Sequence, residues 1–223
     1  MKKMLFALCL VPGMVSAQET EDAFWALSLK GGVTDDIIAP AFSTQLSSTI
    51  QVTGSLKDTS GRALGVGLSR EFSISEKPRR MRLGVEFARA QTEPVVTRLG
   101  KTATNTPLDL TLDMALLEGG FRFFLSEERA FELWGSVAAG VASFGHSGTV
   151  TIGSCNCLDN TNETGRVVRP SLEVVYRVTD SLRLGLEFSR YFLDEKDAAD
   201  RYPRTQLEFT DFNALSAVLH LNF

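Results

Sequence analysis

The sequence predicts an all-β protein, a transmembrane up-and-down antiparallel β-barrel of eight strands. Three observations lead to this fold class. Apolar and polar residues alternate with a period of two in eight separate runs, which is typical of strands with two different faces. The connections between these runs are alternately short and long. No apolar stretch of the mature chain reaches the roughly 20 residues of a membrane-spanning helix, so a membrane crossing would have to use strands.

The N-terminal residues MKKMLFALCLVPGMVSA read as a secretory signal that is cleaved after Ala17, because a basic start precedes an apolar run and a small-residue end. We therefore expect a signal peptide at 1–17 and one barrel domain at 18–223. Removal of Lys2 and Lys3 with the signal leaves 21 of the 23 basic residues, against 27 acidic residues. This net charge of −6 does not favour nucleic acid as a partner.

The eight runs are bounded by turn-forming residues, and most reach the 9 to 11 or so residues with which a tilted strand crosses a bilayer. The connections after the second, fourth and sixth runs are short, whereas the others are long. This rhythm indicates tight turns on the periplasmic side and long loops outside. The runs span residues 24–33, 62–72, 81–91, 108–125, 131–145, 166–178, 182–193 and 207–223.

The fourth run changes its apolar parity along its length. Apolar residues fall on even positions up to Met114 and on odd positions from Leu117 onward. A β-bulge near Ala115 and Leu116 would restore the facing, because one extra residue reverses every side chain beyond it. Alternatively, the residues before Met114 belong to a separate hairpin beyond the membrane.

The polar face of the runs is predicted to line the interior of the barrel. A soluble, lipocalin-like barrel would instead turn its polar face to water. On this face, however, positive and negative charges lie at different distances from the short turns, an order that a solvated wall does not require. Small residues separate the charged positions and suit a crowded lumen: Gly65, Gly67, Gly84, Ala88, Gly120, Ser136, Gly140, Gly185 and Ser189.

Charged residues on the polar face form a predicted network. Arginines lie near the short turns, and glutamates lie four positions farther along the same strands, roughly 13 Å away at about 3.3 Å per residue. We therefore expect each Arg to pair with a Glu of a neighbouring strand, with Glu71 as a further carboxylate. Eight strands leave room only for side chains, so the network should act as a plug. Its predicted members are Arg82, Glu86, Glu118, Arg122, Glu132, Glu173, Arg177, Arg183 and Glu187.

The opposite face of the runs is apolar, gathers aromatic residues toward the strand ends, and is predicted to contact lipid. The signal, the eight runs and the ending A-V-L-H-L-N-F together resemble the small outer-membrane β-barrel proteins, which include OmpA-type and OmpX-type barrels and the opacity-type adhesins. The resemblance covers 18–223 and implies a place in the outer membrane of a Gram-negative bacterium, among its lipid and lipopolysaccharide. In that family the assembly machinery reads a C-terminal aromatic strand as a signal, and Leu219, Leu221 and Phe223 match it. The charged lumen is similar to that of OmpA-type barrels.

We expect no catalytic, cofactor-binding or metal site. His146 and Ser147 are adjacent, so a strand would turn them to opposite sides, unlike the paired His and Ser of a lipid A deacylase. His220 has lumen parity but no serine partner. Asp180-Ser181 lies in a predicted periplasmic turn, whereas a palmitoyltransferase-type barrel needs this pair at the outer rim.

Cys155 and Cys157 lie in the third long loop. The oxidising cell envelope favours a disulfide, although a bridge across one residue is strained and closes almost no loop. Pairing with another molecule is the alternative. A metal site would need about four ligands, and only His146 and Asp159 are near in the sequence.

These features favour a non-enzymatic outer-membrane protein with a structural or adhesin-like, surface-interaction role. Loops on a rigid scaffold commonly carry binding, so the polar outer loops are where a surface or host ligand would bind. The second hypothesis is a narrow porin-like channel for small solutes. The third is a lipid A-modifying barrel enzyme.

Overall fold

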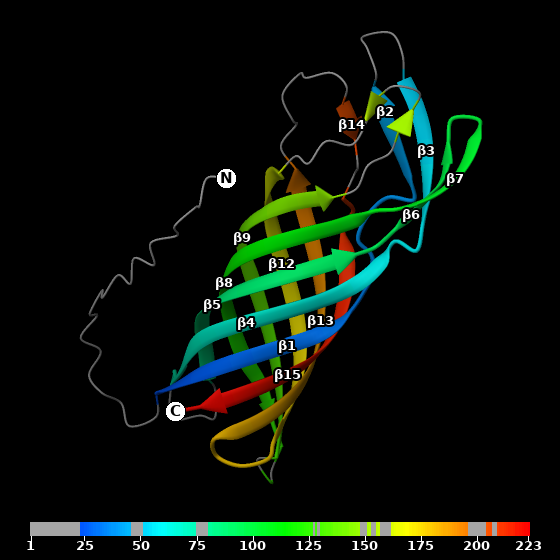
Figure 1. Ribbon diagram of the computed structural model, residues 1–223. Helices are drawn as coiled ribbons and strands as arrows, with labels where there is room; N and C mark the ends of the chain where they lie inside the picture. Colours follow the sequence, from blue (N-terminus) through cyan, green and yellow to red (C-terminus); the bar gives the residue numbers. More distant parts are fainter. Residues whose placement is uncertain are drawn as a thin grey trace.

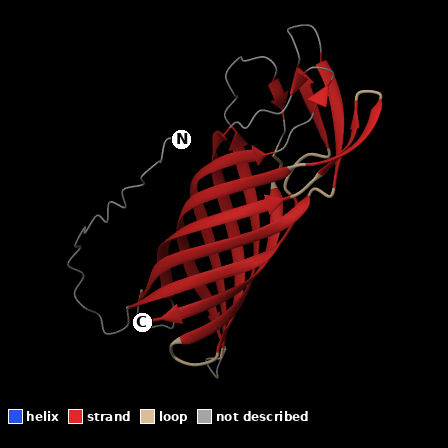
Figure 2. Ribbon diagram, viewed as in Figure 1, coloured by secondary structure: helices blue, strands red, loops and turns tan. Residues whose placement is uncertain are grey.

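The computed structural model describes residues 23–45, 51–74, 80–126, 128, 130–147, 151–152, 155–156, 162–195, 204–206 and 209–223 (Figure 1). Within these ranges the regular elements are strands (Figure 2). None of the described segments is a helix long and apolar enough to cross a bilayer. The expected signal peptide at 1–17 lies outside the described residues.

Eight antiparallel strands close into a barrel, which confirms the predicted fold class. Each strand contains most of one predicted run, although the last begins at Phe212 and not at 207. Around the barrel the order is β1, β15, β13, β12, β9, β8, β5, β4, and β4 then pairs with β1. The strands are β1 (Phe24–Asp36), β4 (Ser60–Ser73), β5 (Arg80–Thr92), β8 (Asp109–Leu125), β9 (Phe131–Ser147), β12 (Asn162–Arg177), β13 (Leu182–Glu195) and β15 (Phe212–Asn222).

The first and last strands of the barrel pair along their whole shared length. The register runs from Ala26 opposite Asn222 to Thr34 opposite Ala214. It extends to Phe223, whose N–H donates to the Trp25 carbonyl at 2.9 Å while the Trp25 N–H donates to the Phe223 carbonyl at 3.0 Å. Because both strands are paired on both sides, the wall has no free edge there.

The bulge predicted near Ala115 and Leu116 is wrong. β8 pairs with β5 and β9 in continuous register through this region, and its register shift lies between Arg122 and Phe124. Nor is the stretch before Met114 a separate hairpin, because it is the upper end of the barrel wall. The apolar parity changes because the interior itself changes. Even positions of β8 from Leu110 to Arg122 face inward, and they are apolar above and charged or small below.

All four long connections contain short strands where polar loops were expected. β2 (Ala41–Gln45), β3 (Gln51–Lys57), β6 (Val95–Leu99), β7 (Thr102–Pro107) and β14 (Arg204–Gln206) form a five-stranded sheet beyond one end of the barrel (Figure 1). β10 (Thr151–Ile152) pairs with β11 (Cys155–Asn156).

The segments of the extra sheet carry β-branched residues, and Phe42, Leu56 and Val96 of the sheet belong to a buried apolar cluster that includes Leu110 of barrel strand β8. Gly100 adopts a φ of 58° in the turn between β6 and β7, a conformation that favours glycine. The sheet rests on a set of buried apolar side chains, Ile38, Phe42, Leu56, Val96, Leu108 and Leu110. This sheet is called the extension below.

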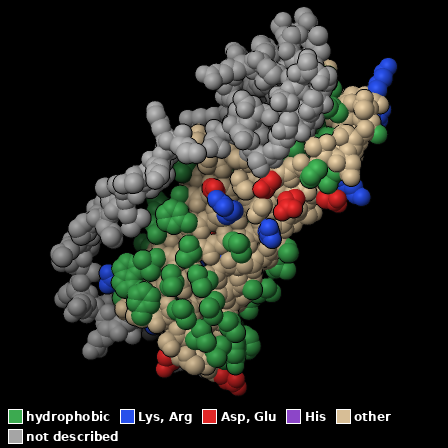
Figure 3. Space-filling model, viewed as in Figure 1, with side chains coloured by type: hydrophobic (Ala, Val, Ile, Leu, Met, Phe, Trp, Pro, Cys, Tyr) green, Lys and Arg blue, Asp and Glu red, His purple; other side chains and the backbone are tan. Residues whose placement is uncertain are grey.

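The outer wall of the barrel is an apolar belt. Figure 3 shows hydrophobic side chains over its lower part and charged side chains above them. Aromatic side chains are exposed near the short-turn end, where a lipid interface would lie: Trp25, Phe123, Phe124, Phe131, Tyr176 and Phe223. The other exposed apolar residues include Leu64, Val66, Leu83, Phe87, Leu117, Val137, Val141, Leu172, Leu186, Phe188 and Leu215. An apolar surface of this extent is typical of a wall that contacts membrane lipid and not of one that is exposed to water.

Inward glycines are required where the wall approaches other atoms closely, and this predicts a difference between two substitutions. A Cβ at Gly84 would lie 2.6 Å from Ser69 Cβ and 2.7 Å from the Leu68 carbonyl oxygen, whereas a Cβ at the outward Gly119 would lie 3.6 Å from Leu83 Cδ2. Gly84→Val should lower the free energy of unfolding by about 1–3 kcal/mol through overpacking, and Gly119→Val should leave it nearly unchanged. Urea titration of the refolded barrel, read by heat-modifiable gel migration, measures both. Equal midpoints for the two variants would contradict the assigned facing.

Candidate functional site

The candidate site is the barrel interior, where Lys, Arg and Glu side chains from seven of the eight barrel strands form ion pairs. The structure places all nine predicted members of the network there. We call the ion-paired set the lattice. Its carboxylates are Glu71, Glu86, Glu118, Glu132, Glu173 and Glu187, and its cations are Lys30, Arg82, Arg122, Arg169, Arg177 and Arg183.

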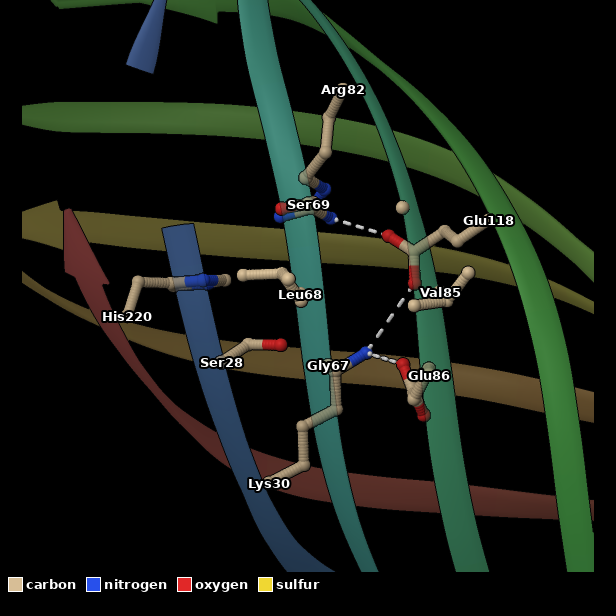
Figure 4. A pocket seen from close by; sticks show the side chains of 11 residues that line it. Ser28, Lys30, Gly67, Leu68, Ser69, Arg82, Val85, Glu86, Glu118 and His220 are labelled. Atoms are coloured by element: carbon tan, nitrogen blue, oxygen red, sulfur yellow. Dashed lines mark ion pairs between the residues drawn. The ribbon is translucent and has the colours of Figure 1, made fainter. Parts of the chain in front are cut away.

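The upper tier of the lattice is organised around Lys30 of β1 and Arg169 of β12. Lys30 Nζ lies 2.8 Å from carboxylate oxygens of both Glu86 and Glu187, and 3.7 Å from Glu118. Figure 4 shows the lysine reaching toward Glu86 and Glu118. Arg169 is fully buried, forms an ion pair with Glu86 through both terminal nitrogens, and donates to Glu118 at 2.8 Å. Glu86 and Glu118 are therefore each shared between Lys30 and Arg169.

The middle tier is centred on Arg82 of β5. Its Nη2 lies 2.9 Å from Glu118 and 3.1 Å from Glu173, and its guanidinium carbon lies 5.0 Å from the centre of the Trp134 ring. On the other side of Glu173, His220 Nε2 lies 2.6 Å from the second carboxylate oxygen. The Glu173 carboxylate therefore links β5, β12 and β15.

The lower tier lies near the short turns and is centred on Glu132 of β9. Its carboxylate accepts from Arg177 at 2.8 Å, from Arg122 at 3.1 Å and from the Trp134 ring nitrogen at 2.9 Å. The Arg183 guanidinium lies 3.4 Å from the Glu132 carboxylate and 2.5 Å from the Glu71 carboxylate, and so connects the two. Four arginines were predicted near this end. Arg122, Arg177 and Arg183 lie in this tier, whereas Arg82 lies higher.

Most pairs in the lattice connect strands that are not neighbours in the wall. Arg82 and Glu118 are on adjacent strands, as predicted. Other ion pairs cross the lumen, namely Arg82 with Glu173, Arg169 with Glu86, and Arg183 with Glu71. A pair across the lumen ties one side of the barrel to the other. Such pairs restrain the register of distant strands, which a pair between adjacent strands cannot do.

Two central cations, Lys30 and Arg169, were absent from the predicted network. Both lie at interior parity, since Lys30 follows Ala26 and Ser28, and Arg169 precedes Glu173 by four positions. Inward parity was therefore a signal that could have found them. Neither fits the pattern of an Arg near a short turn, on which the prediction depended.

Small side chains make room for these long ones. A Cβ at Gly185 would contact the Glu173 carboxylate, and one at Gly65 would lie 3.3 Å from Glu86 Oε1. Ser136 and Ser171 form a hydroxyl pair at 2.6 Å beside the lattice. The small residues predicted to face a crowded lumen at positions 65 and 185 therefore border the carboxylates.

An apolar layer covers the lattice on the side of the extension. The Tyr191 and Phe212 rings stack at 4.4 Å between centroids, and Arg169 Nη1 donates to the Tyr191 hydroxyl at 3.4 Å where the two layers meet. The layer consists of Ile37, Ala88, Ala90, Leu112, Met114, Leu116, Ala138, Ala142, Phe144, Val167, Tyr191, Phe212 and Ala214. The interior therefore has two filled layers in series, one ionic and one apolar.

Little space remains between the side chains of the ionic layer. A cavity bordered by Ser28, Lys30, Arg82, Glu118 and His220 has a volume of about 10 Å³. This is close to the smallest volume that holds one water molecule. Figure 4 shows these side chains directed toward one another from β1, β5, β8 and β15.

The other residues weighed for chemistry lie outside the lattice. His146 and Ser147 are consecutive in β9, and Asp180 and Ser181 lie in the short turn before β13. Cys155 is in β11, but Cys157 lies outside the described residues, so the disulfide stays a prediction. In the described part of the chain, no group of three or more His, Cys, Asp and Glu side chains could hold a metal ion.

The buried position of Arg169 predicts a large loss of stability when it is replaced. Arg169→Met leaves Glu86 and Glu118 with fewer counter-charges, so the free energy of unfolding should fall by about 3–5 kcal/mol. Glu86→Gln together with Arg169→Met should cost less than the sum of the two single changes. As a control, Arg62→Met removes an exposed pair with Glu93 at 3.8 Å and should cost about 0–1 kcal/mol. Urea unfolding in detergent micelles measures all four; similar losses for Arg169→Met and Arg62→Met would refute the lattice as a structural element.

No protein-family model and no curated protein sequence matches the chain. Solved structures match it in fold. Neisserial surface protein A (NspA) is 11% identical with a TM-score of 0.46, over 90% of this chain and 99% of that one. OprG from Pseudomonas aeruginosa is 11% identical with a TM-score of 0.49, over 89% and 95%. Ail from Yersinia pestis, solved with the heparin analogue sucrose octasulfate, is 12% identical with a TM-score of 0.41, over 89% and 99%. By its closed topology, apolar belt and charged interior, the chain is a small transmembrane β-barrel of the outer-membrane type.

Proposed function

We propose that this protein is a closed outer-membrane barrel that serves as a rigid anchor for surface interaction and does not transport solutes. The observation that carries this proposal is the filled interior, in which the lattice and the apolar layer follow one another along the lumen. A solute would have to separate several buried ion pairs and then displace packed apolar side chains. Removing one partner of a buried pair costs about 3–5 kcal/mol, so spontaneous opening is rare.

The height of the apolar belt supports insertion in a thin bilayer. On β4 the outward residues between Arg62 and Arg70 are Leu64, Val66 and Leu68. Eight residues at about 3.3 Å, on a strand tilted by about 40°, give roughly 20 Å along the membrane normal. Outer-membrane barrels carry an apolar band of about 25 Å, and the bacterial outer membrane is thinner than average.

The extension supports a role in recognition. It projects beyond the barrel on the side of the long connections, where the resemblance to outer-membrane proteins places the exterior of the cell (Figure 1). Its own buried cluster gives it a defined shape. A rigid scaffold with polar segments at its end is a common arrangement for binding a surface or host ligand.

The inward position of His220 favours a structural role over catalysis. Its ring is buried and bonded to Glu173, so a lipid in the surrounding membrane does not reach it. Leu219 and Leu221 of β15, and Phe223 directly after it, lie at outward parity, a position that supports recognition of this strand by the assembly machinery during insertion. Outer-membrane lipid and lipopolysaccharide are the expected surroundings of the belt.

Planar-bilayer recording tests the closed interior. The wild-type barrel should give no steady conductance, because two layers close the lumen in series. Glu86→Gln with Arg169→Met disturbs only the ionic layer, and Ile37→Ala with Phe212→Ala disturbs only the apolar layer, so each double variant should stay closed. The fourfold variant should conduct.

Heat-modifiable gel migration verifies that each recorded variant is folded. A steady, large current from the wild-type protein would overturn the proposal in favour of the porin-like alternative. Mass spectrometry of lipid A from cells with and without the gene tests the enzymatic alternative, and an altered acylation pattern would support that reading.

A further inference from the structure

The extension has one face turned away from its buried cluster, and this outer face carries exposed cations. Ser55 of β3 lies between Gly54 and Leu56, which are buried, so its side chain points to the opposite side of the sheet. Arg98 of β6 is paired with Ser55 and therefore shares that side. Lys57, two residues beyond Ser55, shares it as well, and both cations are exposed.

The cations of the outer face lie within reach of one extended ligand. Diagonal neighbours on antiparallel strands are separated by about 7–8 Å, which is the relation of Lys57 to Arg98. Lys101, in the turn between β6 and β7, adds a third exposed cation at the outer end of the extension, where Figure 3 shows Lys and Arg side chains. Arg98 Nε donates to the Gly100 carbonyl at 3.1 Å, which holds the arginine beside this turn and leaves its terminal nitrogens to bind an oxyanion.

These three cations have no acidic partner. Segments 41–57 and 95–107 contain them and no Asp or Glu, although the mature chain has an expected net charge of −6. In the described part of the chain no carboxylate, that of the adjacent Asp58 included, forms an ion pair with any of them, whereas Arg89 on the barrel wall lies 2.6 Å from Asp113. An anion is therefore attracted to the outer face and repelled by the rest of the chain, which directs it to the extension.

The rest of the outer face consists of small side chains, many of them with hydroxyl groups. Ser43 of β2 lies opposite Thr53 of β3 on this face. The only aromatic residue of segments 41–57 and 95–107 is Phe42, which belongs to the buried cluster. Protein partners usually bind aromatic anchors, and single-stranded nucleic acids stack on aromatic rings. A chain of acidic sugars fits better, because its hydroxyls can bond to serine and threonine and its acidic groups to the cations.

We propose that the outer face of the extension binds an acidic polysaccharide of a surface outside the bacterium, with its sulfate or carboxylate groups on Lys57, Arg98 and Lys101. The inference rests on the proposed function, because it names a ligand class for the recognition assigned to the extension. The extension projects beyond the barrel and away from the apolar belt, so its outer face meets an approaching surface and not the bilayer around the wall (Figure 1). Exposed charges carry the binding, so added salt should weaken it.

Matched triple variants of the purified, folded full-length protein test this surface. The first replaces the cations of the outer face: Lys57→Gln, Arg98→Gln and Lys101→Gln. The control removes the same net charge from exposed arginines of the barrel wall: Arg62→Gln, Arg89→Gln and Arg166→Gln. Biolayer interferometry in detergent micelles measures the Kd for size-defined dextran sulfate, with unmodified dextran of the same length as the neutral probe. Heat-modifiable gel migration verifies that each variant is folded.

The outer-face variant should bind dextran sulfate about tenfold more weakly or worse, because each exposed charge contact contributes roughly two- to fivefold. The control variant should stay within about twofold of the wild type, and unmodified dextran should not bind. Equal losses in the two variants would overturn the site, since binding would then follow net charge alone. Duplex DNA that binds at least as tightly as dextran sulfate would overturn the ligand class. Purified lipopolysaccharide that does so would overturn the external source.

Failure of this inference is distinguishable from failure of the proposed function. None of the six substitutions lies in the lattice or the apolar layer, so the closed interior should persist in every variant. If the wild-type barrel conducts steadily, the proposed function fails whatever its affinity for polysaccharide. If the barrel is closed and the two triple variants bind alike, only the polysaccharide site fails.

Discussion

The structure depends on one constraint, which is that the interior of a closed eight-stranded barrel has to be filled by the side chains of its own wall. Charges placed there lose their hydration and need partners within reach. In this barrel the partners come mostly from strands across the lumen, as with Arg169 and Glu86 or Arg183 and Glu71. Buried pairs of this kind need not add net stability, but each imposes the register in which both partners meet.

The composition of the rest of the interior follows from the same constraint. Long charged side chains occupy the cross-section only where the facing wall is small, which is why Gly185 lies against Glu173 and Gly65 near Glu86. Above the lattice the interior needs no hydration or pairing, because apolar side chains such as Phe212 and Leu112 fill it. Arg169 and Tyr191 join the two layers, since the guanidinium lies 5.7 Å from the ring centre while its terminal nitrogens bind carboxylates.

A filled interior leaves the outer surfaces for contact with other molecules. The apolar belt faces outward on the barrel strands, where the proposed bilayer would lie. The extension stands on its own apolar cluster and presents polar segments beyond the wall. In the proposed function the barrel contributes rigidity and position, and recognition is assigned to the extension.

The sequence by itself determined the fold class, the strands and their facing, because alternation with a period of two is a local pattern that survives without knowledge of the partners. It also predicted nine charged residues of the interior from their parity and their spacing from the short turns. Only the tertiary structure decided which of them meet, because strand tilt and stagger bring together residues far apart in the chain, such as Lys30 and Glu187 at 2.8 Å. The continuous register of β8 past Ala115 could likewise be known only from the tertiary structure. In the sequence, apolar residues that face the interior and apolar residues that face outward appear as a change of parity. The apolar layer inside the barrel explains that change without a bulge.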